Sequence, residues 1–178
     1  PFEPTPEARL WHDTSEPPGA EPFDGPLHIR EIRRGDMMHE VLAQIGLFEG
    51  DAEPHIAAAL DKVRPEDDGF ERGAIASTVR AFLTQPDVCT LFASVPGRSS
   101  KNEQEIVSKD GRLFRVDRAI VDAESVTVVD FKTGGRDLEE KYKKQVRAYL
   151  TLLADLYPGR RLRGVLAYVD RGMIVEVT

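Results

Sequence analysis

The sequence contains a single cysteine, Cys89, and no long apolar run among its 178 residues. One cysteine cannot form an internal disulfide, and it excludes a four-cysteine zinc site or an iron–sulfur cluster built from this chain alone. No stretch approaches the roughly 20 apolar residues that cross a bilayer, and no signal-peptide pattern is present. We therefore expect a cytoplasmic protein with no iron–sulfur cluster and no membrane partner.

Positive charge is also scarce, because 24 Lys and Arg stand against 31 Asp and Glu, giving a net charge of −7. Such a balance argues against indiscriminate binding to nucleic acid. The basic residues are unevenly placed, however, and one cluster contains Lys141, Lys143, Lys144 and Arg147. Alone, this cluster is more often a solvated helix face. Beside a metal site it would suit contacts to phosphate groups.

Prolines are concentrated at the start of the chain, where residues 1–26 hold seven of the twelve. This segment has few apolar residues and no sustained period, which predicts a linker or an extended arm. Residues 27–178 are long enough for one domain with a substantial core. The first residue is Pro rather than Met, which indicates a fragment of a longer chain or a processed product.

Apolar spacing predicts helices first and strands later in the chain. The first expected helix is capped by Asp36 and ends near Gly46. Further helices are expected at 53–63, 70–83, 87–94 and 138–156, and strands at 103–108, 111–121, 126–132, 162–169 and 173–177. This order predicts an α/β domain with a mixed central sheet.

The strands at 111–121 and 126–132 read as a β-hairpin around the turn-like residues 122–125. If the loop is symmetric about Ala123 and Glu124, Asp117 lies directly opposite Asp130. Opposed side chains have Cβ atoms roughly 4.5–5.5 Å apart, and like charges there are destabilising. Lys132 shares the face of Asp130. The bland alternative is that Asp117 pairs with a neighbouring Arg, and that Asp130 and Lys132 form a surface salt bridge.

The apolar residues around these charges argue against that alternative. Val126 and Val128 are expected on the carboxylate face, and Phe114, Val116 and Val129 on the opposite one. A sheet that is apolar on both faces is covered on both sides. Unpaired buried charges are costly, so a divalent cation between the carboxylates is the simplest remedy.

With these residues, the arrangement resembles the PD-(D/E)XK nuclease fold, in particular the RecB/AddA type found at the C-terminus of bacterial helicases. Asp117 matches the first acidic residue, with Val116 in place of the Pro that gives the family its name. Asp130-Phe131-Lys132 matches the D/E-x-K motif. The resemblance implies a restriction-endonuclease-like core of helix, three-strand meander, helix and strand, with an N-terminal helical extension.

Two further features are typical of the RecB/AddA type. A histidine on the first helix is matched by His39, four residues after Gly35, and a Gln-x-x-x-Tyr motif by Gln145 and Tyr149. Taken singly, a lone His near a helix start is more often structural, and Tyr149 could belong to the core. A buried Gln145 would need hydrogen-bond partners.

The resemblance also implies the roles of these residues. His39, Asp117, Asp130 and the backbone carbonyl of Phe131 would hold Mg²⁺ or Mn²⁺. Catalysis would use Asp117, Asp130, Lys132 and Gln145, and contacts to DNA would use Tyr149, Lys141 and Lys144.

An acidic residue on the first strand often completes such a site, and Glu103 and Glu105 compete for this position. A two-residue turn at Asp110-Gly111 would place both on the face opposite Asp117, whereas a bulge or a longer turn would reverse that. We favour Glu103 as the ligand.

We therefore expect a metal-dependent DNA nuclease domain. The resemblance implies an exonuclease of a helicase–nuclease in double-strand break repair, acting on single strands or unwound duplex ends beside a superfamily 1 helicase. One alternative is an inactive nuclease-fold module that binds DNA or serves as a scaffold. Another is a structure-specific endonuclease. The intact carboxylates and Lys132 argue against the first, and His39 with Gln145 and Tyr149 against the second.

Overall fold

The computed structural model of the chain describes residues 26–63 and 69–178. The Pro-rich arm predicted at 1–26 lies outside these residues except for its last position. The described elements are α1 (Pro26–Gln44), α2 (Glu53–Lys62), α3 (Gly69–Leu83), α4 (Pro86–Phe92), β1 (Ser99–Val107), β2 (Leu113–Val121), β3 (Ser125–Lys132), α5 (Glu139–Leu156), β4 (Arg161–Tyr168), a short 3₁₀ turn (Val169–Arg171) and β5 (Met173–Val177).

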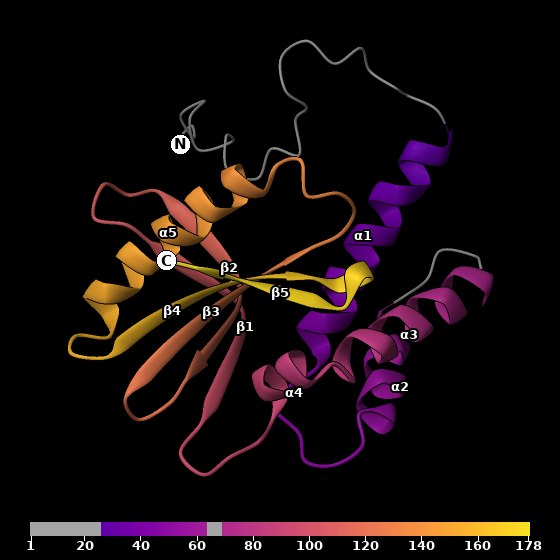
Figure 1. Ribbon diagram of the computed structural model, residues 1–178, viewed down its shortest axis with the longest axis horizontal. Helices are drawn as coiled ribbons and strands as arrows, with labels where there is room; N and C mark the ends of the chain where they lie inside the picture. Colours follow the sequence, from indigo (N-terminus) through magenta and orange to yellow (C-terminus); the bar gives the residue numbers. More distant parts are fainter. Residues whose placement is uncertain (1–25, 64–68) are drawn as a thin grey trace, which may run out of the picture.

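The five strands form one mixed sheet in the order β1-β2-β3-β4-β5 (Figure 1). β3 and β4 are parallel and are connected through α5, and the other neighbours are antiparallel. This confirms the predicted α/β class, with helices before the meander and one helix before the fourth strand. Among the described residues, no helix combines the length and the apolar character that crossing a bilayer requires.

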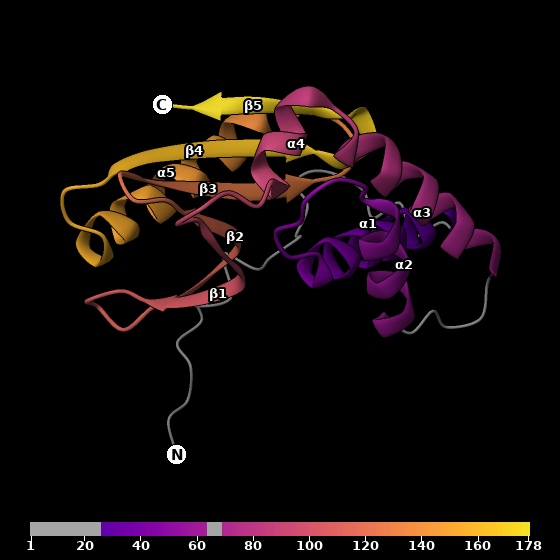
Figure 2. The ribbon, with the colours of Figure 1, turned by 90° about the horizontal axis from the view of Figure 1, so that it is seen from below.

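Helices cover both faces of the sheet (Figures 1 and 2). The apolar faces of α1 to α4 pack on one side against Ile120, Val129, Phe131, Val165 and Ala167. On the other side, α5 packs through Val146, Tyr149 and Leu153. The expected burial of the sheet on both faces is confirmed. Charged groups inside it are therefore removed from water on both sides.

Helix α1 is longer than its apolar pattern predicted. It begins at Pro26, so Asp36 lies inside the helix and does not cap it. Residues 30–34 are exposed, whereas Met38, Val41 and Leu42 are buried. The apolar spacing marked only the part of α1 that packs against the core, because the exposed residues 30–34 are mostly charged and form no apolar face.

The β1–β2 hairpin corrects one prediction about side-chain faces. Phe114 and Val116 were expected opposite Val126 and Val128, but all four pack in one cluster with Tyr149. The ladder between β1 and β2 lacks the pair at Glu103, whose φ is 49°. The hairpin therefore twists at this point. Side chains of β2 before and after it do not follow one strict alternation between the two faces of the sheet.

Candidate active site

The hairpin of β2 and β3 has the predicted register. Arg118 pairs with Val129, and the ladder runs from there to the pair of Val121 with Val126, next to the loop that begins at Asp122. The ladder ends one position before Asp117 and Asp130. There the Phe131 backbone N–H donates to Asp117 Oδ2 at 2.8 Å. Asp117 thus accepts a strand N–H through its side chain, and the two carboxylates lie at the point where the strands begin to separate.

Burial disfavours the ionised form of both carboxylates. Desolvation raises the pKa of Asp130 to about 6, and the charge of Asp117 adds to this rise while Lys132 opposes it. Desolvation also raises the pKa of Asp117 to about 6, against the charge of Lys132 and the hydrogen bond from Phe131. The two groups form a coupled pair, in which ionisation of one disfavours ionisation of the other.

Lys132 is the cation nearest to this pair. Its Nζ lies 2.6 Å from Asp130 Oδ2, and only 16% of its side chain is exposed. Burial lowers the pKa of Lys132, but the charges of Asp130 and Asp117 outweigh it, so the pKa is raised overall. Nζ also lies 4.7 Å from the ring centroid of Tyr142. The sequence alone did not predict this contact.

The Asp130 oxygen nearest to Lys132 is not fully satisfied. Among the described residues, Asp130 Oδ2 is a buried atom that the Lys132 amine contacts at 2.6 Å. A carboxylate oxygen accepts at two lone pairs, so contact with one amine leaves a lone pair for a metal cation.

Helix α1 brings His39 to the same place. His39 Nδ1 lies 3.7 Å from Asp117 Oδ2, and the ring meets Phe131 edge-on. Desolvation and the charge of Lys132 lower the pKa of His39, so its imidazole is neutral at neutral pH. One turn earlier, Gly35 lets α1 approach the end of β3, since a Cβ there would lie 2.8 Å from Thr133 Oγ1.

The β1–β2 turn settles which glutamate faces Asp117. Ser108 N–H donates to the carbonyl of Arg112 and closes a loop longer than two residues. Glu103 consequently lies opposite Asp117, between the pairs flanking it in the ladder, while Glu105 pairs with Arg115. Glu103 Oε2 contacts Arg115 Nε at 2.8 Å. Sequence reasoning did not single out Arg115.

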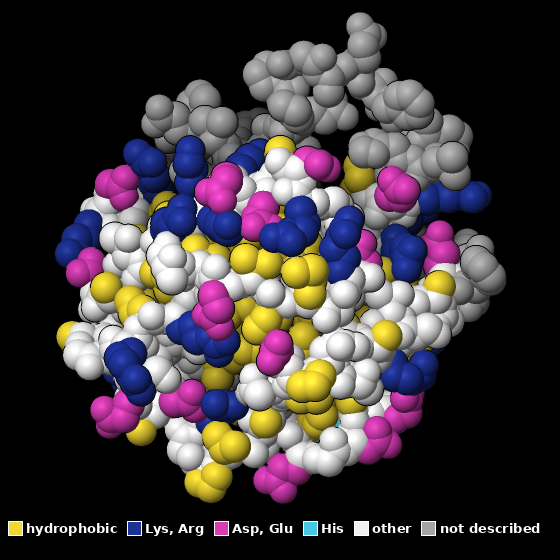
Figure 3. All heavy atoms as spheres, viewed as in Figure 1, with side chains coloured by type: hydrophobic (Ala, Val, Ile, Leu, Met, Phe, Trp, Pro, Cys, Tyr) yellow, Lys and Arg dark blue, Asp and Glu magenta, His cyan; other side chains and the backbone are white. Residues whose placement is uncertain are grey.

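The motif on α5 also lies beside the carboxylates. Gln145 Nε2 donates to the Tyr149 hydroxyl at 2.7 Å. Burial raises the pKa of Tyr149, and the charges of Asp130 and Asp117 raise it further. Lys141 and Lys144 are exposed on the same helix. In Figure 3, Lys and Arg side chains form a band, interspersed with Asp and Glu, over α5 and the segment before it.

The donor set suits a hard divalent cation, although the side chains are not placed around a common point. Within residues 26–63 and 69–178, no three His, Cys, Asp or Glu side chains are close enough together to form a metal site. Two buried carboxylates, a free lone pair on Asp130 and a neutral His39 nevertheless provide oxygen and imidazole donors. This chemistry fits Mg²⁺ or Mn²⁺ better than a thiolate-preferring metal.

Comparison with known families agrees with this geometry. The family model of the PD-(D/E)XK nuclease superfamily matches residues 24–176. The chain belongs to this superfamily. The match spans all the elements that contribute site residues, from α1 to α5. A comparison with curated proteins finds no significant match.

Membership supplies the general function of the PD-(D/E)XK chain. It implies a nuclease, hence a hydrolase, whose substrate is DNA. Nucleases of this superfamily typically use divalent metal ions. The five-stranded mixed sheet flanked by helices is consistent with their restriction-endonuclease-like fold.

Proposed function

We propose that the chain is a metal-dependent deoxyribonuclease whose reaction takes place at Asp117, Asp130 and Lys132. One observation carries this proposal. Two carboxylates with raised pKa values are buried where β2 and β3 separate, beside a buried amine. These buried charges do not stabilise the sheet, because a buried charge costs free energy unless it is fully paired. A function that needs the charges explains their presence.

Asp117, Asp130, His39 and the carbonyl of Phe131 would hold Mg²⁺ or Mn²⁺, and Glu103 is a further candidate ligand. When bound, such an ion supplies an activated water and neutralises charge on the scissile phosphate. The Phe131 N–H keeps Asp117 oriented through its hydrogen bond. Helix α1 holds His39 beside Asp117.

Lys132 acts as a fixed positive charge in this proposal. Because the neighbouring carboxylates raise its pKa, the amine is protonated at neutral pH. A protonated amine stabilises negative charge that develops on the phosphate during hydrolysis. Its position is restrained from two sides, by Asp130 and by the ring of Tyr142.

Residues of α5 would position the substrate. The hydroxyl of Tyr149 and the amide of Gln145 form one hydrogen-bonded unit beside the carboxylates. Gln145 would orient the attacking water or the phosphate. Tyr149, Lys141 and Lys144 would contact the strand. These contacts reach the DNA backbone, so cleavage should depend little on base sequence.

The proposal extends to the RecB/AddA type, supported by His39 and by the Gln145–Tyr149 pair. For that type we infer an exonuclease that works with a superfamily 1 helicase in double-strand break repair. Its substrate would be single-stranded DNA or an unwound duplex end.

The test uses the 178-residue chain with fluorescently labelled linear and circular single-stranded DNA, in Mg²⁺ and in Mn²⁺. Wild type should shorten the linear substrate, and Lys132→Ala and Asp117→Ala should not. Lys109→Ala is a matched control, because Lys109 also pairs with an aspartate but lies on the exposed hairpin loop. Cutting of circular DNA would identify an endonuclease. Equal cutting by wild type and Lys132→Ala would refute the proposed site.

A further inference from the structure

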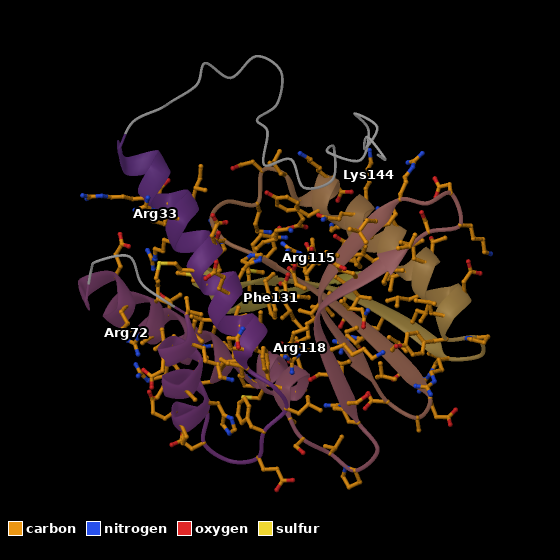
Figure 4. The ribbon with its side chains drawn as sticks, turned by 180° about the vertical axis from the view of Figure 1, so that it is seen from behind. Arg33, Arg72, Arg115, Arg118, Phe131 and Lys144 are labelled. Carbon is orange, nitrogen blue, oxygen red and sulfur yellow. The ribbon has the colours of Figure 1, made fainter. Side chains whose placement is uncertain are left out.

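Arg115 lies beside the candidate site and has no role in the proposal above. It precedes Asp117 by two residues on β2, and 52% of its side chain is exposed. Burial raises the pKa of Asp117, and the charges of Lys132 and Arg115 oppose that rise. The charge of Arg115 also opposes the raised pKa of the buried Tyr149. In the view of Figure 4, Arg115 lies between α1 and the strands, on the side of Lys144.

This position differs from that of the other arginine on β2. Arg118 is fully buried and donates hydrogen bonds to the carbonyls of Leu91, Ile45 and Gly46. Its donors are therefore directed into the protein and hold the ends of α1 and α4. Among the described residues, Arg115 forms an ion pair with Glu103 through Nε, and no contact of its outer guanidinium nitrogens with a described acidic side chain is seen. These nitrogens have the geometry to bind a phosphate.

Glu103 reaches Arg115 from an unusual backbone conformation. Its φ of 49° is the only positive value for a non-glycine residue in the described part of the chain. Backbone conformations of this kind cost free energy and are concentrated at functional sites. The ladder pairs on both sides of Glu103 are present, so the missing pair is the one opposite Asp117.

We propose that Arg115 contacts a phosphate of the DNA strand next to the one being cleaved, and that Glu103 is a positioning residue that holds its guanidinium there. This inference rests on the proposed nuclease function and assigns the site one more substrate contact. It also gives Glu103 a role other than metal ligand. The carboxylate lies against Nε, which leaves the outer nitrogens of the half-exposed guanidinium for the phosphate.

The first test measures binding of wild-type protein to a fluorescein-labelled oligothymidine strand in EDTA, over a range of KCl concentrations. Each phosphate contact contributes about 0.7 to the slope of log K against log[KCl] for single strands. Arg115→Ala should reduce that slope by about this amount, and Arg115→Lys should retain it. Arg112→Ala is the matched control, since Arg112 is 49% exposed and pairs with Asp110 at 2.9 Å on the same hairpin. Its slope should equal that of wild type.

The second test separates the two roles of Glu103 by kinetics in Mg²⁺. Glu103→Ala should lower kcat about tenfold, because Arg115 is no longer held in position. The salt slope should be unchanged, since the arginine itself remains, and so should the half-saturating Mg²⁺ concentration. Glu103→Gln, whose amide oxygen can occupy the same place beside Nε without the charge, should restore part of kcat. A several-fold rise in the half-saturating Mg²⁺ concentration would make Glu103 a metal ligand and overturn its positioning role.

These outcomes distinguish a failure of this inference from a failure of the proposed nuclease function. If wild type neither binds nor cleaves DNA, both are wrong. If wild type binds and cleaves DNA while Arg115→Ala and Arg112→Ala behave alike, only the inference fails.

Discussion

Replacing Asp117 by Asn should stabilise the metal-free protein at neutral and alkaline pH while abolishing its activity. The amide oxygen of Asn can still accept the hydrogen bond from the Phe131 N–H, so the substitution removes mainly the charge. Asp117 is only 16% exposed, and its ionised form is unfavourable in the fold. Ionised Asp117 therefore lowers the free energy of unfolding, and the neutral Asn should restore it.

The size and sign of this effect follow from the pKa. Burial raises the pKa of Asp117 from 3.8 to about 6. A raised pKa means that the folded state holds the proton more tightly than the unfolded chain. Its contribution to stability is therefore fully present below about pH 4 and is lost as the pH rises through 6. The shift corresponds to about 3 kcal/mol, or about 6–12 °C in Tm for a domain of this size.

The assay is urea denaturation of wild type and Asp117→Asn in EDTA, at about pH 4 and about pH 8. The variant should be more stable at the higher pH and equal to wild type at the lower one. Added Mg²⁺ should raise the stability of wild type alone, because ligand binding to the folded state stabilises it. Asp155→Asn is the control, since Asp155 is an exposed aspartate paired with Lys109. It should change stability little at either pH.

A variant that is less stable than wild type in EDTA at about pH 8 would refute the reasoning, as would a stability difference that does not change with pH. Either result would mean that the carboxylate is satisfied in the absence of metal. The argument that its burial reflects function would then fail.

Three more substitutions test the packing around the site. Arg118→Leu should lower the free energy of unfolding by at least about 3 kcal/mol, because it removes four hydrogen bonds to buried or part-buried acceptors, of which the Ile45 carbonyl keeps Asn102 as a donor; a urea midpoint close to wild type would contradict this. Gly164→Ala should cost about 1–3 kcal/mol, measured as a lower Tm, since the new Cβ would lie 2.6 Å from Val146 Cγ1. Tyr142→Leu should lower kcat about 2- to 30-fold with little change in KM, because Lys132 loses the ring beneath its amine. Tyr142→Phe keeps the ring and should retain kcat, so equal losses in the two variants would argue against the contact.

The sequence predicted the register of the β2–β3 hairpin because the information there is local. A symmetric loop and two strands of alternating residues determine the register between Asp117 and Asp130, and the structure has that register at the neighbouring pairs. The order of helices and strands likewise follows from apolar periodicity. The superfamily could be recognised because its motifs lie on elements with strong patterns.

The features that were missed depend on tertiary contacts or on backbone conformation. The positive φ of Glu103 has no sequence signal, and it rotates the hairpin so that Phe114 and Val116 change face. The contact between Lys132 and Tyr142 needs α5 docked on the sheet. One signal was available, since Arg118 directly precedes the apolar run Ala119-Ile120-Val121 on a strand expected to be covered on both faces, which indicates a functional or a deeply buried cation.

Helix α1 is attached to the sheet at two points, and His39 lies between them. At its middle Gly35 abuts Thr133, which follows β3, and past its end Arg118 and Asn102 bind the carbonyl of Ile45. The hairpin carboxylates belong to the sheet, whereas the imidazole belongs to this helix. Partial unfolding of α1 would therefore remove one donor and leave the other two in place. The proposed site then persists only while this one helix stays docked, and its activity would be lost reversibly while the sheet remains folded.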